Sequence, residues 1–303
     1  MIISSMTTMY AKRREDDEFI SLNESIRRHH ALGYRVLDLN LCALQRDEGP
    51  FSGDNWKEVA YSMKETADQL GVSFYQGHLP FRSMKFVDTD EEMVRKLHDA
   101  TMRAVEICGI AGVKWVVAHP VASPYAPAEE VELHVAENHR IYDRVVERLT
   151  ELKVGIAFEN VPAHAKIERF GSRASDLVAL IDSYHSDFVG GCWDFGHGNL
   201  NYGELQTWGI RKMGKRLKAL HFADNLGARD DHLPPFVGMI NWEKIMQTLA
   251  EVDYDGCLVL ETVQNSRLPD HLKESSMRFL GDVCAHLDSL FENAKKELKE
   301  KEV

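Results

Sequence analysis

The sequence predicts an α/β protein that folds as a single (β/α)8 barrel. Eight short apolar runs alternate with eight longer amphipathic runs along its 303 residues. The short runs read as strands buried on both faces, which is typical of a parallel sheet closed into a barrel. An open doubly wound sheet would need a glycine-rich phosphate loop after its first strand, and residues 6–10 contain no glycine. No break in composition marks a second domain, so we expect one domain over residues 1–303.

The first four strand–helix units have recognisable boundaries. Capping boxes begin at Ser21 and Thr89, and Gly33 and Gly71 end two helices. Pro127 suits the first helical position of the fourth helix. The predicted strands are 1–5, 35–40, 73–76 and 113–118. The predicted helices are 21–32, 56–70, 89–108 and 127–152.

The second half of the chain repeats the pattern four more times. The predicted strands are 154–158, 188–193, 217–220 and 257–260. The predicted helices are 175–185, 204–215, 242–252 and 270–290, and Asn241 is placed to cap the third of them. The charged C-terminal tail, about 292–303, is expected to fray.

The composition limits the cellular setting and the partners. With 44% hydrophobic residues the chain can bury a sizeable core, and a net charge of −12 argues against a broad basic surface for nucleic acid. The five cysteines are scattered without CxxC spacing, so we expect buried thiols in a reducing cytosol. The N-terminus lacks the basic and apolar regions of a signal peptide, and no run approaches the ~18 apolar residues of a membrane span. We therefore expect a soluble, cytoplasmic protein without a membrane partner.

Six successive strands end in a side chain that can bind a metal ion. In a barrel, side chains at the carboxyl ends of the strands converge on one mouth. Any one such residue would be explained as a satisfied polar group at a strand end, but six in succession favour a metal site. These residues are His78, His119, Glu159, Asp194, His221 and Glu261.

The loops after the sixth and seventh strands add further ligand types. His197 follows Asp194 at a spacing of three, and Asp230 and His232 lie in an acidic loop beside Arg229. Arg229 could bind a substrate hydroxyl or phosphate, or equally be a solvated loop arginine. Mixed carboxylate and imidazole ligands suit Mn, Mg, Co, Zn or Fe, and the absence of thiolates argues against a purely structural zinc.

Glu159 and Glu261 are expected to face each other across the mouth, because they end strands five and eight. Two carboxylates on opposite sides of a metal can exchange a proton with a substrate carbon while the cation stabilises an enediolate oxygen. A hydrolytic enzyme would use the same ligands to activate water.

The sequence around these residues resembles the xylose isomerase-like TIM-barrel superfamily, and in particular its sugar phosphate isomerase/epimerase group. The segments that carry the resemblance are 77–80, 117–120, 158–161, 193–197, 220–221, 230–238 and 260–262. The resemblance implies one divalent metal (Mn, Mg, Co or Zn) held by Glu159, Asp194, His221 and Glu261. It also implies that the two glutamates are the catalytic acid/base pair and that His197 contacts the substrate. The implied substrate is a small sugar, a sugar phosphate or a polyol.

Three other interpretations stay open. The same superfamily contains endonuclease IV-like phosphodiester hydrolases with three zinc ions, whose ligands match nine positions here: His78, His119, Glu159, Asp194, His197, His221, Asp230, His232 and Glu261. The sequence around the ligands favours the isomerase branch, and no basic stripe is evident for DNA. A polyol dehydratase would use nearly the same site, and a binding subunit would need the ligands but not the glutamate pair. A homo-oligomer is compatible with the sequence.

Several features give weaker signals. The isomerase pattern has Gly-x-Gly after the two prolines of the acidic loop, whereas this chain has Gly238 alone. His29 and His30 are expected on the surface, and Lys166 could point at substrate or at water. Three aromatic residues could line the pocket or pack elsewhere: Phe81, Trp193 and Phe236.

Overall fold

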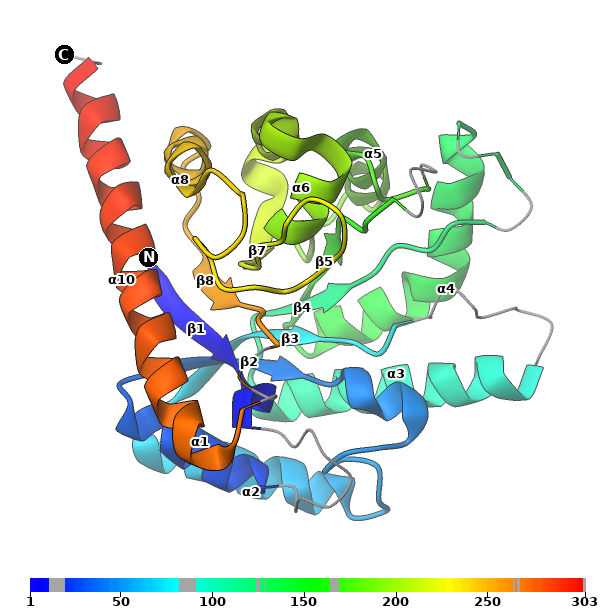
Figure 1. The fold of residues 1–303 in the computed structure, drawn as a ribbon. Helices are drawn as coiled ribbons and strands as arrows, with labels where there is room; N and C mark the ends of the chain where they lie inside the picture. The colour runs from blue at the N-terminus through cyan, green and yellow to red at the C-terminus, as the bar shows by residue number, and fades with distance from the viewer. Residues whose placement is uncertain are drawn as a thin grey trace.

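The chain forms a barrel of eight parallel strands (Figure 1). The computed structural model describes residues 1–10, 20–81, 91–123, 126–127, 129–163, 169–263, 265 and 268–301. The strands are β1 (Ile2–Met6), β2 (Val36–Asn40), β3 (Ser73–His78), β4 (Trp115–Ala118), β5 (Gly155–Glu159), β6 (Val189–Asp194), β7 (Leu217–His221) and β8 (Cys257–Leu260). Neighbours in sequence are neighbours in the sheet from β1 to β7, and β8 pairs with β1.

Two backbone hydrogen bonds connect β7 to β8 and close the ring. Phe222 N, one residue past β7, donates to Val259 O at 2.8 Å, and Glu261 N donates to Phe222 O at 3.2 Å. The predicted (β/α)8 TIM barrel is therefore confirmed.

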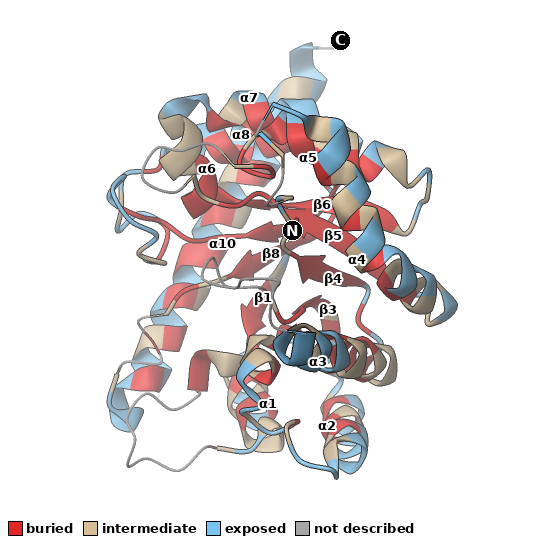
Figure 2. Cartoon of the chain, turned by 90° about the vertical axis from the view of Figure 1, so that its right-hand side faces the viewer, coloured by how far each residue is buried: buried red, intermediate tan, exposed pale blue. Residues whose placement is uncertain are grey.

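The helices surround the strands and turn their apolar faces inward (Figure 2). Those described are α1 (Leu22–Ala31), α2 (Trp56–Leu70), α3 (Glu91–Ala111), α4 (Val131–Glu151), α5 (Ala174–Ser183), α6 (Phe195–Tyr202), α7 (Gln206–Met213), α8 (Trp242–Glu251) and α10 (Asp270–Lys301). Short 3-10 helices are η1 (Thr7–Tyr10), η2 (Cys42–Arg46), η3 (Gly203–Leu205) and η4 (Gly214–Arg216). The predicted caps are present where described: Ser21 Oγ accepts from Glu24 N at 3.2 Å, and Asn241 Oδ1 accepts from Lys244 N at 3.0 Å.

Two residues named in the predictions, Thr89 and Lys166, lie outside the described residues. Three other local predictions need correction. Helix α4 begins at Val131, because the carbonyl of Pro127 accepts from Glu130 N in a turn and lies 2.9 Å from His134 Nε2. Helix α6 was not predicted. Helix α10 continues to Lys301 instead of fraying after 291, because Ala294 and Leu298 extend its apolar stripe against the core.

The barrel interior below the mouth is filled by Trp115 and several small side chains, with Tyr75 packed against them. Trp115 packs with Val117, Ala157, Cys192 and Ala219. A Cβ atom on Gly155 would lie 2.2 Å from the Trp115 ring, so the neighbouring strand needs glycine there. This layer fills the barrel below the carboxyl ends of the strands, where the predicted site residues lie. Within the described part of the chain, every helix is too short or too polar to span a bilayer.

Candidate metal centre

Glu159 is the hub of the polar cluster at the mouth of the barrel. It ends β5 and is 1% exposed. Its Oε1 lies 2.6 Å from His221 Nδ1, and its Oε2 lies 2.9 Å from His119 Nε2 and 3.3 Å from His78 Nε2. Imidazoles at the ends of β3, β4 and β7 therefore converge on one carboxylate.

His221 lies between two carboxylates. Its Nδ1 is also 3.0 Å from Oε2 of Glu261, the residue that follows β8. The strand register pairs His221 with Asp194 at the ends of β7 and β6. Ligand atoms of Glu159, Asp194, His221 and Glu261 all lie within 4.8 Å of one another. The structure thus brings together the four residues that were predicted to hold one divalent cation.

Asp194 has one carboxylate oxygen engaged and one without a partner. Its Oδ1 accepts from His197 N at 2.6 Å and caps helix α6. Its Oδ2 is buried and has no hydrogen-bond partner among the described residues. Burial, reinforced by Glu159 against the opposing effect of His197, raises the pKa of Asp194 to about 7. A buried carboxylate oxygen without a donor is costly unless a cation meets it, so this atom fits a metal ligand.

Asn160 holds Asp194 in place and was not among the predicted site residues. Asp194 N donates to Asn160 Oδ1 at 2.6 Å, and Asn160 Nδ2 donates to the Asp194 carbonyl at 2.9 Å. The carbonyl of Asn160 also lies 2.8 Å from His197 Nδ1. The only sequence signal for this role is its position directly after Glu159, which does not reveal a clamp to the next strand.

A second polar group lies beside the first. Asp230 Oδ2 is 3.2 Å from His197 Nε2 and 3.0 Å from His232 Nε2. Burial opposes charge on these groups, but the two imidazoles outweigh it and hold the pKa of Asp230 well below its usual range. In the same way Asp230, with Glu261, overcomes burial and raises the pKa of His232 to about 10.

Three of the histidines share one orientation. The Nδ1 atoms of His78, His197 and His232 lie 2.8, 2.8 and 3.0 Å from the carbonyls of Leu79, Asn160 and Glu261. A carbonyl can only accept, so each Nδ1 carries the proton and each Nε2 faces a carboxylate. Metal-binding histidines commonly donate their second N–H in this manner.

The loop that carries Asp230 and His232 is organised by a buried aspartate that sequence reasoning missed. Asp224 Oδ2 accepts from Trp242 Nε1 at 2.9 Å and from Phe236 N at 3.1 Å, and its Oδ1 accepts from Ile240 N at 3.2 Å. A Cβ atom on Gly238 would lie 2.1 Å from Asp224 Oδ1, which explains the single glycine after the prolines.

Three of the remaining candidates fall outside the cluster, and the fourth reaches it. The Arg229 side chain is 84% exposed and lies 3.3 Å from Asp231, so it is a solvated loop residue. Trp193 is fully buried and packs away from the mouth, with its Nε1 3.4 Å from Gln206. Phe236 is 42% exposed and lies near Trp242 and His286. Phe81 does reach the site: its ring stacks on His119 with centroids 4.6 Å apart.

Comparisons with known proteins agree with this architecture. The family model described as xylose isomerase-like TIM barrel matches residues 26–282. The uncharacterized protein y4fM of Sinorhizobium fredii is 38% identical over 124 residues, 41% of this chain and 38% of that protein. The D-psicose 3-epimerase of Enterocloster bolteae is 24% identical over 242 residues, 76% of this chain and 73% of the relative. The solved structure of an L-ribulose 3-epimerase matches with a TM-score of 0.72 at 13% identity, covering 99% of this chain and 98% of that chain.

Proposed function

The chain belongs to the xylose isomerase-like TIM barrel family, and from that premise we propose that it is a divalent-metal-dependent sugar isomerase or epimerase. The observation that carries the proposal is the pair of carboxylates around one nitrogen: Glu159 and Glu261 lie 2.6 and 3.0 Å from His221 Nδ1. Their strands β5 and β8 bring them to the same centre from different sides of the mouth. The similarity to D-psicose 3-epimerase supports epimerisation of a small ketose.

The residues fit a bound cation. Glu159, Asp194, His221 and Glu261 would hold it, and the unpartnered Oδ2 of Asp194 is the atom that most requires it. Three carboxylates and one imidazole suit Mn, Mg, Co or Zn. Such a cation supplies positive charge that stabilises developing negative charge on substrate oxygens.

The two glutamates supply the proton transfers. Burial would raise the pKa of Glu261, but His221 outweighs it and lowers that pKa to about 2; the pKa of Glu159 is likewise held well below its usual range. Both side chains are therefore ionised at neutral pH and can act as bases. One glutamate removes the proton from the carbon next to the carbonyl and becomes a carboxylic acid. The other glutamate, once it has taken up a proton from solvent, donates that proton to the same carbon from the opposite face and becomes a carboxylate again. These two proton transfers invert the configuration of that carbon.

Hydrogen exchange tests the proposal. We expect the purified, metal-loaded protein to exchange a carbon-bound hydrogen of at least one ketose or ketose phosphate with deuterated water, followed by NMR. Glu159→Gln and Glu261→Gln should each lower the exchange rate by about a hundredfold or more, since each removes a base. Metal content is measured on every variant, and Glu58→Gln, a change at an exposed glutamate on α2, should leave the rate unaltered. The proposal is contradicted if none of the ketoses and ketose phosphates tested exchanges a carbon-bound hydrogen.

A second candidate function is a three-metal phosphodiester hydrolase of the endonuclease IV type. The shared orientation of His78, His197 and His232, each with Nε2 toward a carboxylate, favours it, because it prepares two further ligand groups around Glu159 and Asp230. Anomalous scattering at the zinc edge and cleavage of abasic-site DNA distinguish the two functions. Three metal peaks together with cleavage that Glu261→Gln abolishes would establish the hydrolase. A polyol dehydratase would instead release a dehydrated product from its substrate.

A further inference from the structure

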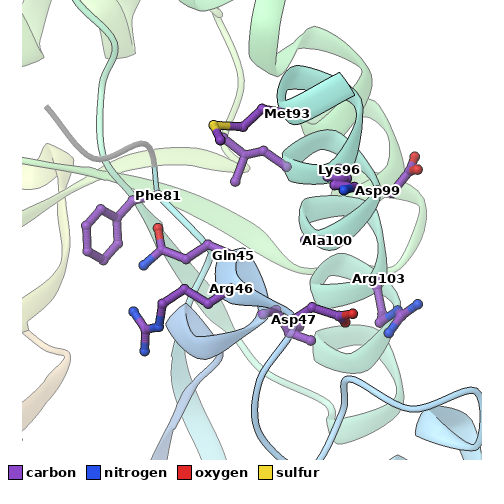
Figure 3. Close-up of a pocket in the computed structure, with 11 residues that line it drawn as sticks. Gln45, Arg46, Asp47, Phe81, Met93, Lys96, Asp99, Ala100 and Arg103 are labelled. Atoms are coloured by element: carbon purple, nitrogen blue, oxygen red, sulfur yellow. The ribbon is translucent and has the colours of Figure 1, made fainter. Parts of the chain in front are cut away.

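A cavity of about 650 Å³ lies next to the metal centre, between η2 and helix α3 (Figure 3). Its volume falls within the roughly 300–1,000 Å³ of pockets that bury small ligands. Apolar side chains from both elements line it together with polar ones, among them Leu44, Gln45, Met93 and Leu97. The mechanism above assigns no role to this space.

Phe81 joins the cavity to the metal centre. Phe81 is one of the residues that line the cavity, and its ring stacks on His119 with centroids 4.6 Å apart and lies 5.9 Å from His78. In Figure 3 the side chains of Gln45 and Arg46 extend toward the same side of the cavity as Phe81. The cavity and the candidate metal centre therefore have Phe81 as a common neighbour.

Two cations of the cavity are already engaged within the protein. Arg103 donates to the carbonyls of Phe51 and Ser52 at 3.0 and 2.8 Å, which fixes its guanidinium. Arg46 Nε donates to Glu48 at 3.0 Å. These bonds use one nitrogen of each guanidinium, so both side chains keep N–H groups that can donate to the oxygens of a ligand.

The other charged residues of the cavity are one cation, Lys96, and two acidic residues. Lys96 Nζ lies 2.8 Å from Glu92 Oε1. Asp47 and Asp99 are exposed residues of the cavity lining, and the Asp99 carboxylate lies on the side of α3 away from η2 (Figure 3). These carboxylates would repel a phosphate, but they readily accept hydrogen bonds from hydroxyl groups. Because each of the three cations already has an oxygen partner, the lining suits a neutral, hydroxyl-rich ligand.

We infer that this cavity binds a second sugar unit, attached to the ketose that reacts at the metal centre. The inference rests on the proposed function, which it extends from free monosaccharides to ketose disaccharides. The carboxylates and the Gln45 amide would bind hydroxyl groups, and Phe81, Met93 and Leu97 would contact the C–H face of the second ring. Sugar sites combine polar and apolar contacts in this way, with the apolar surface providing much of the burial.

Wild-type selectivity is the first test. Lactulose, maltulose and isomaltulose carry a hexose on oxygen 4 or 6 of fructose and keep the carbonyl and its neighbouring C–H bond. We expect kcat/KM for deuterium exchange to be at least about tenfold higher for one of them than for fructose, since contacts in the cavity stabilise the bound disaccharide. A free ketose preferred over all three disaccharides overturns the inference. A higher kcat/KM for a ketose 6-phosphate than for all three disaccharides indicates an anion site and also overturns the inference.

A variant that fills the cavity is the second test. Ala100 is a small, half-buried residue on its α3 wall, and Ala136 is an exposed alanine on α4. Ala100→Trp should lower the ratio of kcat/KM for disaccharide over free ketose by about tenfold or more, whereas Ala136→Trp should leave this ratio unchanged. Ala100→Leu, a smaller change, replaces it if the Trp variant does not fold. An unchanged ratio in a folded Ala100 variant overturns the inference.

Direct binding separates this inference from the proposed function. If no sugar undergoes exchange, the proposed function fails, but isothermal titration calorimetry of the metal-loaded protein with lactulose, maltulose and isomaltulose still reports on the cavity. Binding to wild type that is weakened about tenfold in the Ala100 variant supports a sugar site. Binding to neither protein overturns it.

Discussion

His29 shows how far a single residue can depart from its sequence neighbourhood. The pair His29–His30 was expected on the surface, but His29 is fully buried. Its Nδ1 lies 2.8 Å from the Ser25 carbonyl, and its ring meets the edge of Tyr10 with centroids 5.0 Å apart. The prediction was wrong because the apolar face of α1 includes position 29 together with Ser25 and Ile26. Burial lowers the pKa of His29 to about 4.

The His29 pKa predicts that the protein loses stability in mild acid. An unfolded histidine titrates near pH 6.5, so between about pH 6.5 and 4 the unfolded chain binds a proton that the folded chain does not. The free energy of unfolding should therefore fall as the pH is lowered through this range, by roughly 3 kcal/mol from this residue. Urea unfolding at a series of pH values measures it. His29→Phe should flatten the dependence and His30→Phe should not; equal slopes for both variants would refute the assignment.

The site residues divide into those that sequence can predict and those that it cannot. A barrel brings all strand ends to one mouth, so His78, Glu159 and His221 could be assigned to one site from their positions alone. Their mutual distances could not, because spacing along the chain does not show that two glutamates meet one nitrogen. Supporting residues such as Asn160 were missed since their role depends on hydrogen bonds to another strand.

At the scale of elements, the loops after β6 and β7 were the least predictable parts of the chain. Helix α6 contains Gly196 and Gly198, which disfavour helix formation. It forms because Asp194 caps it, and its first four residues are buried. The loop that follows β7 is held by buried side chains such as Asp224 and Asn225, and sequence patterns do not reveal such long-range hydrogen bonds. In this protein the segments that tertiary contacts define are also those that carry the site.

Gly238 tests the dependence of the second loop on Asp224. An added Cβ would lie 2.1 Å from Asp224 Oδ1 and 2.5 Å from Asn225 O, so Gly238→Ala must displace the carboxylate from its donors. We expect a loss of about 1–3 kcal/mol in the free energy of unfolding, and weaker activity because Asp230 and His232 move with the loop. Chemical denaturation and the exchange assay measure both.

The matched control for that change is Gly281→Ala on α10. Its nearest neighbour, Tyr34 Oη, would lie 3.6 Å from the new Cβ, an ordinary contact. Alanine in a helix interior should stabilise the protein by about 0.5–1 kcal/mol. If Gly238→Ala behaves like the control, Asp224 does not organise the loop.

For the whole molecule, the alternation of runs was sufficient to predict the fold. Each strand–helix unit is local in sequence, and eight of them in order have a barrel as their natural closure. The details of closure were not predictable: the hydrogen bonds of Phe222 to the β8 segment lie beyond the apolar run of β7. The same holds for α10: its charged last turns were expected to fray, but they contain Ala294 and Leu298 at helical spacing.

The candidate metal centre draws its residues from the ends of four strands, so we expect metal binding to affect the stability of the whole chain. A ligand that binds only the folded state stabilises it by about 2.7 kcal/mol when its free concentration is about 100 times Kd. Adding Mn²⁺, Mg²⁺, Co²⁺ or Zn²⁺ to protein stripped with EDTA should thus raise Tm by roughly 5 °C or more for at least one of the ions. Scanning calorimetry measures the shift, and elemental analysis gives the number of ions bound.

Asp194→Asn removes the negative charge of this side chain but keeps an oxygen that can accept from His197 N. The amide oxygen can still cap α6, since asparagine is as good an N-cap as aspartate, but the unpartnered anionic oxygen is gone. We expect the stripped variant to unfold at or above the wild-type Tm, because it no longer buries that carboxylate among Glu159 and Glu261, and to lose most of the metal-induced shift. Asp255→Asn, at an exposed position, should keep the full shift. A full shift in Asp194→Asn would remove Asp194 from the ligand set and place the cation elsewhere in the mouth.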